Sequence, residues 1–124
     1  MTTPRKGKVV AEHVTKPWGH ETIWARTDRY VGKILHVRAG ESLSLQYHER
    51  KDETMRVLSG ELELEVGGRD EARATVRLGP GEGWHIPPGT RHRMRALVDT
   101  DILEVSTPEL DDVVRLEDRY GRVK

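Results

Sequence analysis

Two stretches of this chain carry residues with the types and spacing of metal ligands: residues 40–60 (GESLSLQYHERKDETMRVLSG) and residues 81–92 (GEGWHIPPGTRH). The candidate ligands are Gln46, His48, Glu53 and His92. Together they offer two imidazole nitrogens, one carboxylate and one amide oxygen. Such a mixed set without a thiolate suits Zn²⁺, Mn²⁺, Fe²⁺, Ni²⁺ or Co²⁺ and does not select among them. One negative ligand leaves a divalent ion net positive, so the ion can polarise a substrate oxygen.

The spacing of the whole set, and no single residue in it, favours a site. Taken alone, His48 is more simply a solvated loop histidine, and charged residues meet by chance in a chain as charge-rich as this one. The combined pattern is G-x5-Q-x-H-x4-E-x6-G followed by G-x5-P-x-G-x2-H. Gln46 and His48 lie two apart on an expected strand, so their side chains point to the same side.

The elements that must position these residues are short strands separated by turns. Alternation is clearest in ELELEV, residues 61–66, where three aliphatic side chains face in and three glutamates face water. Gly67-Gly68 then predicts a two-residue hairpin turn. Residues 109–122 are expected to form one short helix or an extended tail. The expected strands are residues 9–14, 21–25, 30–37, 42–47, 54–58, 61–66, 73–78, 84–86, 90–98 and 101–107. Strands at this spacing indicate an all-β sandwich or barrel.

Length and composition bound the function further. The 124 residues suit one domain, which we place at residues 9–124 behind a flexible N-terminal tail of residues 1–8. Lys+Arg and Asp+Glu balance at 21 each, so we expect no nucleic-acid partner. No apolar run approaches the roughly 20 residues that span a bilayer, and no signal peptide is evident. The absence of cysteine excludes disulfides and thiol chemistry. We therefore expect a cytoplasmic protein without a membrane partner.

The two spaced patterns resemble the paired motifs of the cupin superfamily, which implies a single-domain cupin fold, a jelly-roll barrel with a metal site. Gln46 stands where the first motif usually has histidine, and Ala96 where the second usually ends in asparagine. The glutamine, in LSLQYH, narrows the resemblance to the C-terminal isomerase domain of type II mannose-6-phosphate isomerases. Those domains often stand behind a GDP-mannose pyrophosphorylase. These residues contain no nucleotidyltransferase domain, so we do not expect them to make GDP-mannose.

Further matches to these isomerase domains extend along nearly the whole chain. They are Pro17-Trp18-Gly19, Lys33 on the strand before the first motif, PPGTRHR at residues 87–93 and DVVRLEDRYGR at residues 112–122. Three departures fall around the expected pocket, so the substrate can differ from mannose 6-phosphate. They are Lys51 for a usual arginine, His85 for a common tyrosine and Ser106 for a common glutamine.

An aldose–ketose isomerase needs a base near the substrate carbon and an electrophile for the developing oxyanion. The candidate bases are Lys51, His85 and Glu104; surface or packing roles are the simpler alternatives for all three. The candidate substrate-binding residues are Lys33, Ser44, Arg93 and Arg122. Lys33 shares a strand face with apolar residues, so it needs a ligand or a buried partner such as Glu53 or Glu104. Alternation turns the Arg93 side chain to the other face of the strand from His92, so Arg93 is a candidate only because of the resemblance. Arg115 and Arg122 can cover the mouth, bind phosphate or clamp the tail.

Three functions follow from these candidates. The first is a metal-dependent isomerase that converts mannose 6-phosphate to fructose 6-phosphate or a close analogue, with a phosphorylated sugar as its small-molecule substrate. The second is another metal-dependent cupin enzyme, an iron oxygenase or a lyase. The third is a non-enzymatic sugar-binding cupin with a structural metal. We also expect a homodimer, since the N-terminal strand offers a free sheet edge.

Overall fold

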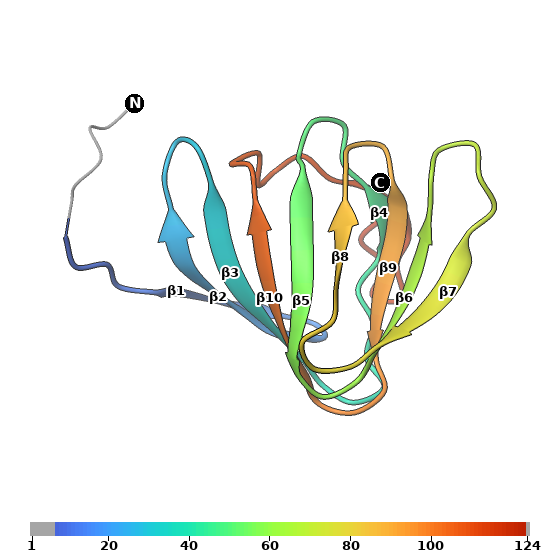
Figure 1. Ribbon diagram of the computed structural model, residues 1–124, viewed down its shortest axis with the longest axis horizontal. Helices are drawn as coiled ribbons and strands as arrows, with labels where there is room; N and C mark the ends of the chain where they lie inside the picture. Colours follow the sequence, from blue (N-terminus) through green and yellow to red (C-terminus); the bar gives the residue numbers. More distant parts are fainter. Residues whose placement is uncertain (1–6, 124) are drawn as a thin grey trace.

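Two antiparallel β-sheets make up the computed structural model, which describes residues 7–123 (Figure 1). No helix occurs among those residues, so the expected all-β class is confirmed. The strands are β1 (Glu12–Lys16), β2 (Gly19–Arg26), β3 (Val31–Val37), β4 (Leu45–Tyr47), β5 (Glu53–Ser59), β6 (Leu62–Gly67), β7 (Ala74–Leu78), β8 (Gly83–Ile86), β9 (Arg91–Ala96), β10 (Thr100–Ser106) and β11 (Val114–Glu117). One sheet has the order β1-β2-β3-β10-β5-β8, and the other β11-β4-β9-β6-β7.

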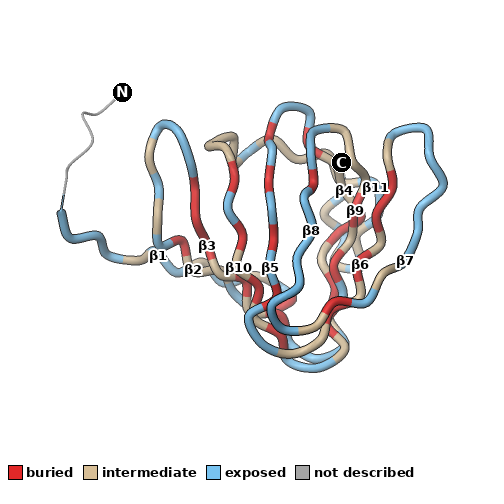
Figure 2. Tube along the Cα trace, in the orientation of Figure 1, coloured by how far each residue is buried: buried red, intermediate tan, exposed pale blue. Residues whose placement is uncertain are grey.

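The core is formed by the inward faces of strands whose sequences alternate. In β6, Leu62 and Leu64 are fully buried, while Glu63 and Glu65 between them are half-buried. In β3, Val31, Lys33, Leu35 and Val37 all face in, as alternation predicts. Figure 2 shows buried residues recurring along β3, β10 and β5. A lysine therefore sits on an otherwise apolar inner face, and its partners matter for the site.

The predicted hairpin turn is wrong, and long-range pairing decides the conformation of the C-terminal segment. Gly67 pairs with Arg91 of β9, and Val66 pairs with Ala74, so β6 and β7 are joined by residues 68–73 and not by a two-residue turn. The C-terminal segment contains the short strand β11, which pairs with β4, so the helix alternative is wrong and the extended one is right. Residues 1–6 of the predicted flexible tail lie outside the described residues. β1 is an edge strand of its sheet, whereas pairing with a second copy stays a prediction.

Two motif glycines adopt the left-handed conformation but have different surroundings. Gly40 has φ 82° and Gly60 has φ 92°. A Cβ at Gly60 would lie 2.5 Å from both Asp99 O and Thr100 Oγ1, whereas one at Gly40 would meet no atom within 4 Å. We expect Gly40→Ala to cost about 1–2 kcal/mol of unfolding free energy for the backbone alone. Gly60→Ala should cost clearly more in urea denaturation, because backbone must also move; equal losses would contradict this reading.

Candidate metal centre and adjoining cavity

The four candidate ligands come from three strands that converge at one place. Gln46 lies on β4 and His48 directly follows that strand. Glu53 begins β5 after the loop of residues 49–52, and His92 lies on β9. The β4–β9 pairing sets Gln46 opposite His92, so their side chains share a face of the sheet. The fold thus brings together residues separated by as many as 46 positions, which sequence spacing alone suggested.

Three of these residues form a compact buried cluster. His48 Nε2 lies 2.8 Å from Glu53 Oε1, and His92 Nε2 lies 3.3 Å from the same oxygen. All three side chains are buried, and their ligand atoms lie within 4.8 Å of one another. Two atoms each bonded to one metal ion at 2.0–2.1 Å and at right angles sit about 3 Å apart. The observed separations fit such a centre.

The outer nitrogens of both imidazoles are fixed by backbone carbonyls. His48 Nδ1 donates to Asp112 O at 2.6 Å, and His92 Nδ1 donates to Thr90 O at 2.9 Å. Since a carbonyl only accepts, each Nδ1 carries a proton, and each Nε2 is turned toward Glu53. His92 Nε2 is buried and has no hydrogen-bond partner. An orphaned buried nitrogen beside a carboxylate is the arrangement that a cation completes.

Glu53 is held in its ionised form. Burial raises the pKa of this carboxyl, but the neighbouring side chains of Glu104, His48 and His92 and the charge of Lys51 outweigh burial, so the pKa lies well below its ordinary value. Gln46 adds an amide to the set, and its Oε1 accepts a hydrogen bond from Ser44 Oγ at 3.0 Å. The donors present, two imidazoles, a carboxylate and an amide, fit a divalent metal ion of the kinds that accept mixed nitrogen and oxygen ligands.

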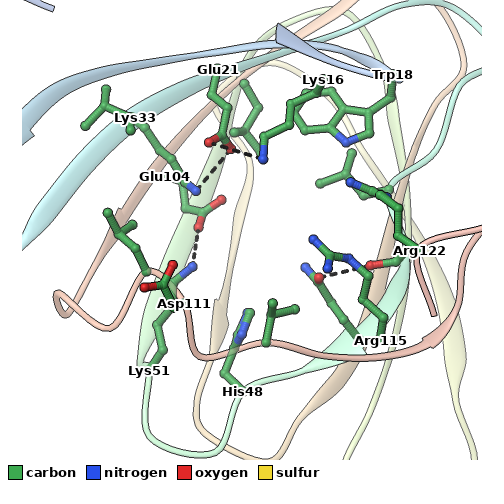
Figure 3. Close-up of a pocket in the computed structure, with 17 residues that line it drawn as sticks. Lys16, Trp18, Glu21, Lys33, His48, Lys51, Glu104, Asp111, Arg115 and Arg122 are labelled. Atoms are coloured by element: carbon green, nitrogen blue, oxygen red, sulfur yellow. Dashed lines mark hydrogen bonds and ion pairs between the residues drawn. The ribbon is translucent and has the colours of Figure 1, made fainter. Parts of the chain in front are cut away.

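A cavity of about 220 Å³ adjoins this cluster (Figure 3). Gln46 and His48 line it, as do residues of β2, β3 and β10 and of the C-terminal segment, residues 109–122, which we call the strap. Its cationic side chains are Lys16, Lys33, Lys51, Arg115 and Arg122. Its carboxylates are Glu21, Glu104 and Asp111. Five cations against three carboxylates suit an anionic ligand.

Two buried lysine–glutamate pairs stand on one side of the cavity in Figure 3. Lys33 Nζ lies 3.2 Å from Glu21 Oε2, and Lys51 Nζ lies 3.3 Å from Glu104 Oε1. Burial lowers the pKa of Lys33, but the charges of Glu104 and Glu21 outweigh it, so the pKa is raised and the lysine is charged. Burial, followed by the charge of Glu53, raises the pKa of Glu104 to about 7.

The structure brings most of the sequence candidates to this cavity. Ser44 is buried in its lining, beside Gln46, and Arg122 lines it while pairing with Asp118. Lys33, Lys51 and Glu104 also line it. The partner of Lys33 is Glu21, however, and not Glu53 or Glu104 as the sequence suggested.

Two candidates lie elsewhere. The His85 side chain is 60% exposed and contacts Asp52, because its neighbour Ile86 takes the inward position on β8. Arg93 pairs with Glu65 and Glu117, because alternation along β9 turns it away from His92. Neither lines the cavity, so the structure gives no support to His85 as a base or to Arg93 as a substrate ligand.

Sequence reasoning missed Glu21 and Asp112. Glu21 lies two residues before the buried Ile23 on β2, and that spacing was the available signal. Asp112 lies in the matched segment of residues 112–122, but no pattern there indicated its contacts. Its carboxylate accepts N–H bonds from Glu49, Arg50 and Lys51 at 3.0, 2.7 and 2.9 Å, and its carbonyl holds His48. Desolvation alone would raise the pKa of Asp112, but these N–H groups lower it.

We expect Asp112→Ala to weaken metal binding about 10- to 100-fold, because the variant frees the loop that carries His48 while leaving every candidate ligand in place. Competition with a chromogenic chelator measures the affinity. Asp70→Ala, in the exposed β6–β7 loop, serves as the control. An unchanged affinity in Asp112→Ala would show that the loop holds His48 without this carboxylate.

Comparison with known proteins relates the chain to one family. The model of the Cupin domain matches residues 33–106. The mannose-1-phosphate guanylyltransferase ManC of Salmonella typhimurium is 36% identical over 115 residues, covering 89% of this chain and 23% of the relative. The mannose-1-phosphate guanylyltransferase of Escherichia coli K12 is 36% identical over 119 residues, covering 92% of this chain and 24% of the relative. The chain thus spans about a quarter of these curated relatives.

Solved structures share the fold. KdgF from Halomonas sp. superposes with a TM-score of 0.71 at 25% identity, covering 82% of this chain and 90% of that one. Oxalate decarboxylase from Bacillus subtilis superposes with a TM-score of 0.75 at 12% identity, covering 92% of this chain and 33% of that one. Residues 7–123 contain no helix long and apolar enough to cross a membrane.

Proposed function

Because this chain belongs to the cupin family, we propose that it is a metal-dependent sugar-phosphate isomerase, acting on mannose 6-phosphate and fructose 6-phosphate or on a close analogue. The observation that carries the proposal is the donor set of Gln46, His48, Glu53 and His92 next to a cavity with excess positive charge. The similarity of nearly the whole chain to part of mannose-1-phosphate guanylyltransferases supports a mannose-related substrate.

The metal ion, held by these four residues, would supply positive charge for a substrate oxygen. The protein's own side chains carry the remaining tasks. Lys33 and Lys51 are buried cations in the cavity lining and bind substrate oxygens. Glu104 is 4% exposed, lines the same cavity and contacts Lys51. Its position makes it the candidate to take the proton from one substrate carbon and return it to the next.

The proposed reaction leaves an isotopic record. In D₂O, an isomerase that works through an enediol exchanges the proton at C2 of mannose 6-phosphate with solvent, and proton NMR follows that signal alongside the appearance of fructose 6-phosphate. We expect both changes with metal-loaded protein. If no hexose 6-phosphate gives either exchange or product, this isomerase is ruled out.

A second candidate reaction rests on one feature of the same site. His48, Glu53 and His92 comprise two histidines and one carboxylate, the ligand set of non-haem iron oxygenases. The amide of Gln46 argues for the isomerase, since it adds a fourth donor. Substrate-dependent oxygen consumption by the iron-loaded protein, without isomerisation, would favour the oxygenase.

A further inference from the structure

The strap places Arg115 against the cavity, and within residues 7–123 this arginine has no carboxylate partner. β11 pairs with β4 so that Arg115 stands directly opposite Gln46. Side chains of directly opposed residues in an antiparallel pair lie on the same face, and Gln46 lines the cavity. Figure 3 shows the Arg115 guanidinium turned into the space between the strap and the strands that carry Lys33 and Glu104.

The other cations of the cavity have carboxylate partners. Lys16 and Lys33 share Glu21, Lys51 contacts Glu104, and Arg122 is held by Asp118. Among residues 7–123, no carboxylate lies within 4.0 Å of the Arg115 guanidinium nitrogens, and its Nε is buried without a hydrogen-bond partner. A buried guanidinium nitrogen without a partner is costly unless a ligand satisfies it.

We propose that Arg115 binds the phosphate of a sugar-phosphate substrate, on the strap side of the cavity and across from Lys33 and Glu104. The proposal rests on the proposed function, because the substrate is taken to be phosphorylated. The planar guanidinium presents two parallel N–H groups, which match two phosphate oxygens. The phosphate would then lie on the strap side, with the sugar carbons toward Glu104. Arg115 is thus a specificity residue that distinguishes a phosphorylated sugar from a free one.

The strap that carries Arg115 is connected to the metal cluster. The backbone carbonyl of Asp112, three residues before Arg115, accepts a hydrogen bond from His48 Nδ1. Its carboxylate accepts hydrogen bonds from the backbone N–H groups of residues 49–51. At the other end, Tyr120 bonds to Glu41 and Arg119 donates to Gly40 O. Arg115 lies between these two attachments, so its position relative to the cluster is fixed before substrate arrives, which reduces the ordering cost of binding.

Calorimetric titration of the metal-loaded protein tests the assignment, with mannose 6-phosphate, mannose, inorganic phosphate and glucuronate as probes. We expect the wild type to bind the phosphate ester at least tenfold more tightly than mannose. Arg115→Gln should weaken that binding about 10- to 100-fold and leave mannose binding and metal content unchanged. Arg115→Lys should recover only part of the loss, because it restores the charge without the fork.

Arg77→Gln is the matched control, since Arg77 pairs with Glu61 on the exposed surface and does not line the cavity. Phosphate-ester binding equal in Arg115→Gln and wild type would overturn the proposal, as would tighter binding of glucuronate than of the phosphate ester. Arg115-dependent binding of mannose 6-phosphate without isomerisation would uphold this inference and remove the proposed function. The two failures are thereby distinguishable.

Discussion

Replacing His92 with alanine is expected to abolish metal retention and to lower isomerase activity by at least roughly 100-fold. His92 Nε2 is buried and has no hydrogen-bond partner, and it lies 3.3 Å from the carboxylate that it would share a metal with. Removing one of four donors weakens a site whose ligands were already brought together by the fold. Elemental analysis after dialysis against a weak chelator, together with the isomerase assay, measures both effects.

The matched control is His85→Ala. His85 lies on β8 with a 60% exposed side chain that contacts Asp52, so its loss should leave metal content and activity within about twofold. Full metal content in His92→Ala would mean that the metal is held elsewhere. Loss of activity in His85→Ala would instead restore the sequence-based candidate that the structure sets aside.

Glu104→Gln is expected to lower kcat by about 10² to 10⁴ while metal content stays the same. The variant keeps the size of the side chain and its place beside Lys51, but an amide cannot accept the substrate proton. Glu104 is buried and lines the cavity, and the other carboxylates of the lining are Glu21 and Asp111. Steady-state kinetics with mannose 6-phosphate gives kcat and KM separately.

Urea denaturation beside C2-proton exchange in D₂O distinguishes the two roles: loss of proton transfer lowers exchange and turnover at unchanged stability, whereas loss of a merely structural Glu104 would lower stability as well. Glu12→Gln serves as the control, because its ion pair with Arg26 is exposed on β1 and remote from the cavity lining. A kcat within threefold of wild type in Glu104→Gln would remove this residue from the chemistry.

Alternation along single strands gave the reliable part of the sequence prediction. It placed Lys33 on the inner face of β3 and Gln46 and His48 on one side of the chain, and the motif spacing added Glu53 and His92. The same rule applied to β8 would have turned His85 outward, since the apolar Trp84 and Ile86 lie on the other face of that strand. His85 became a candidate because it precedes the proline turn and stands where the resembled family has tyrosine, and not because of alternation.

Long-range pairing decided what local pattern left open. The strap sequence DVVRLEDRYGR is compatible with helix or strand, and its conformation follows from β11 pairing with β4, some 68 residues earlier. That pairing also places Arg115 opposite Gln46. Likewise, Glu21 becomes the partner of Lys33 only because β2 and β3 are neighbours, and Asp112 reaches His48 only through the strap. The local sequence around each residue does not predict which residue of another strand it contacts.

The most direct test of a metal-dependent isomerase is one titration. The protein is stripped with a chelator, reloaded stepwise with Zn²⁺, Mn²⁺, Fe²⁺, Ni²⁺ or Co²⁺, and assayed for fructose 6-phosphate formed from mannose 6-phosphate. We predict no activity in the stripped protein and a return in proportion to bound metal, up to one ion per chain, for at least one of these metals. Activity that is unaffected by stripping, or that no metal produces, would contradict the account.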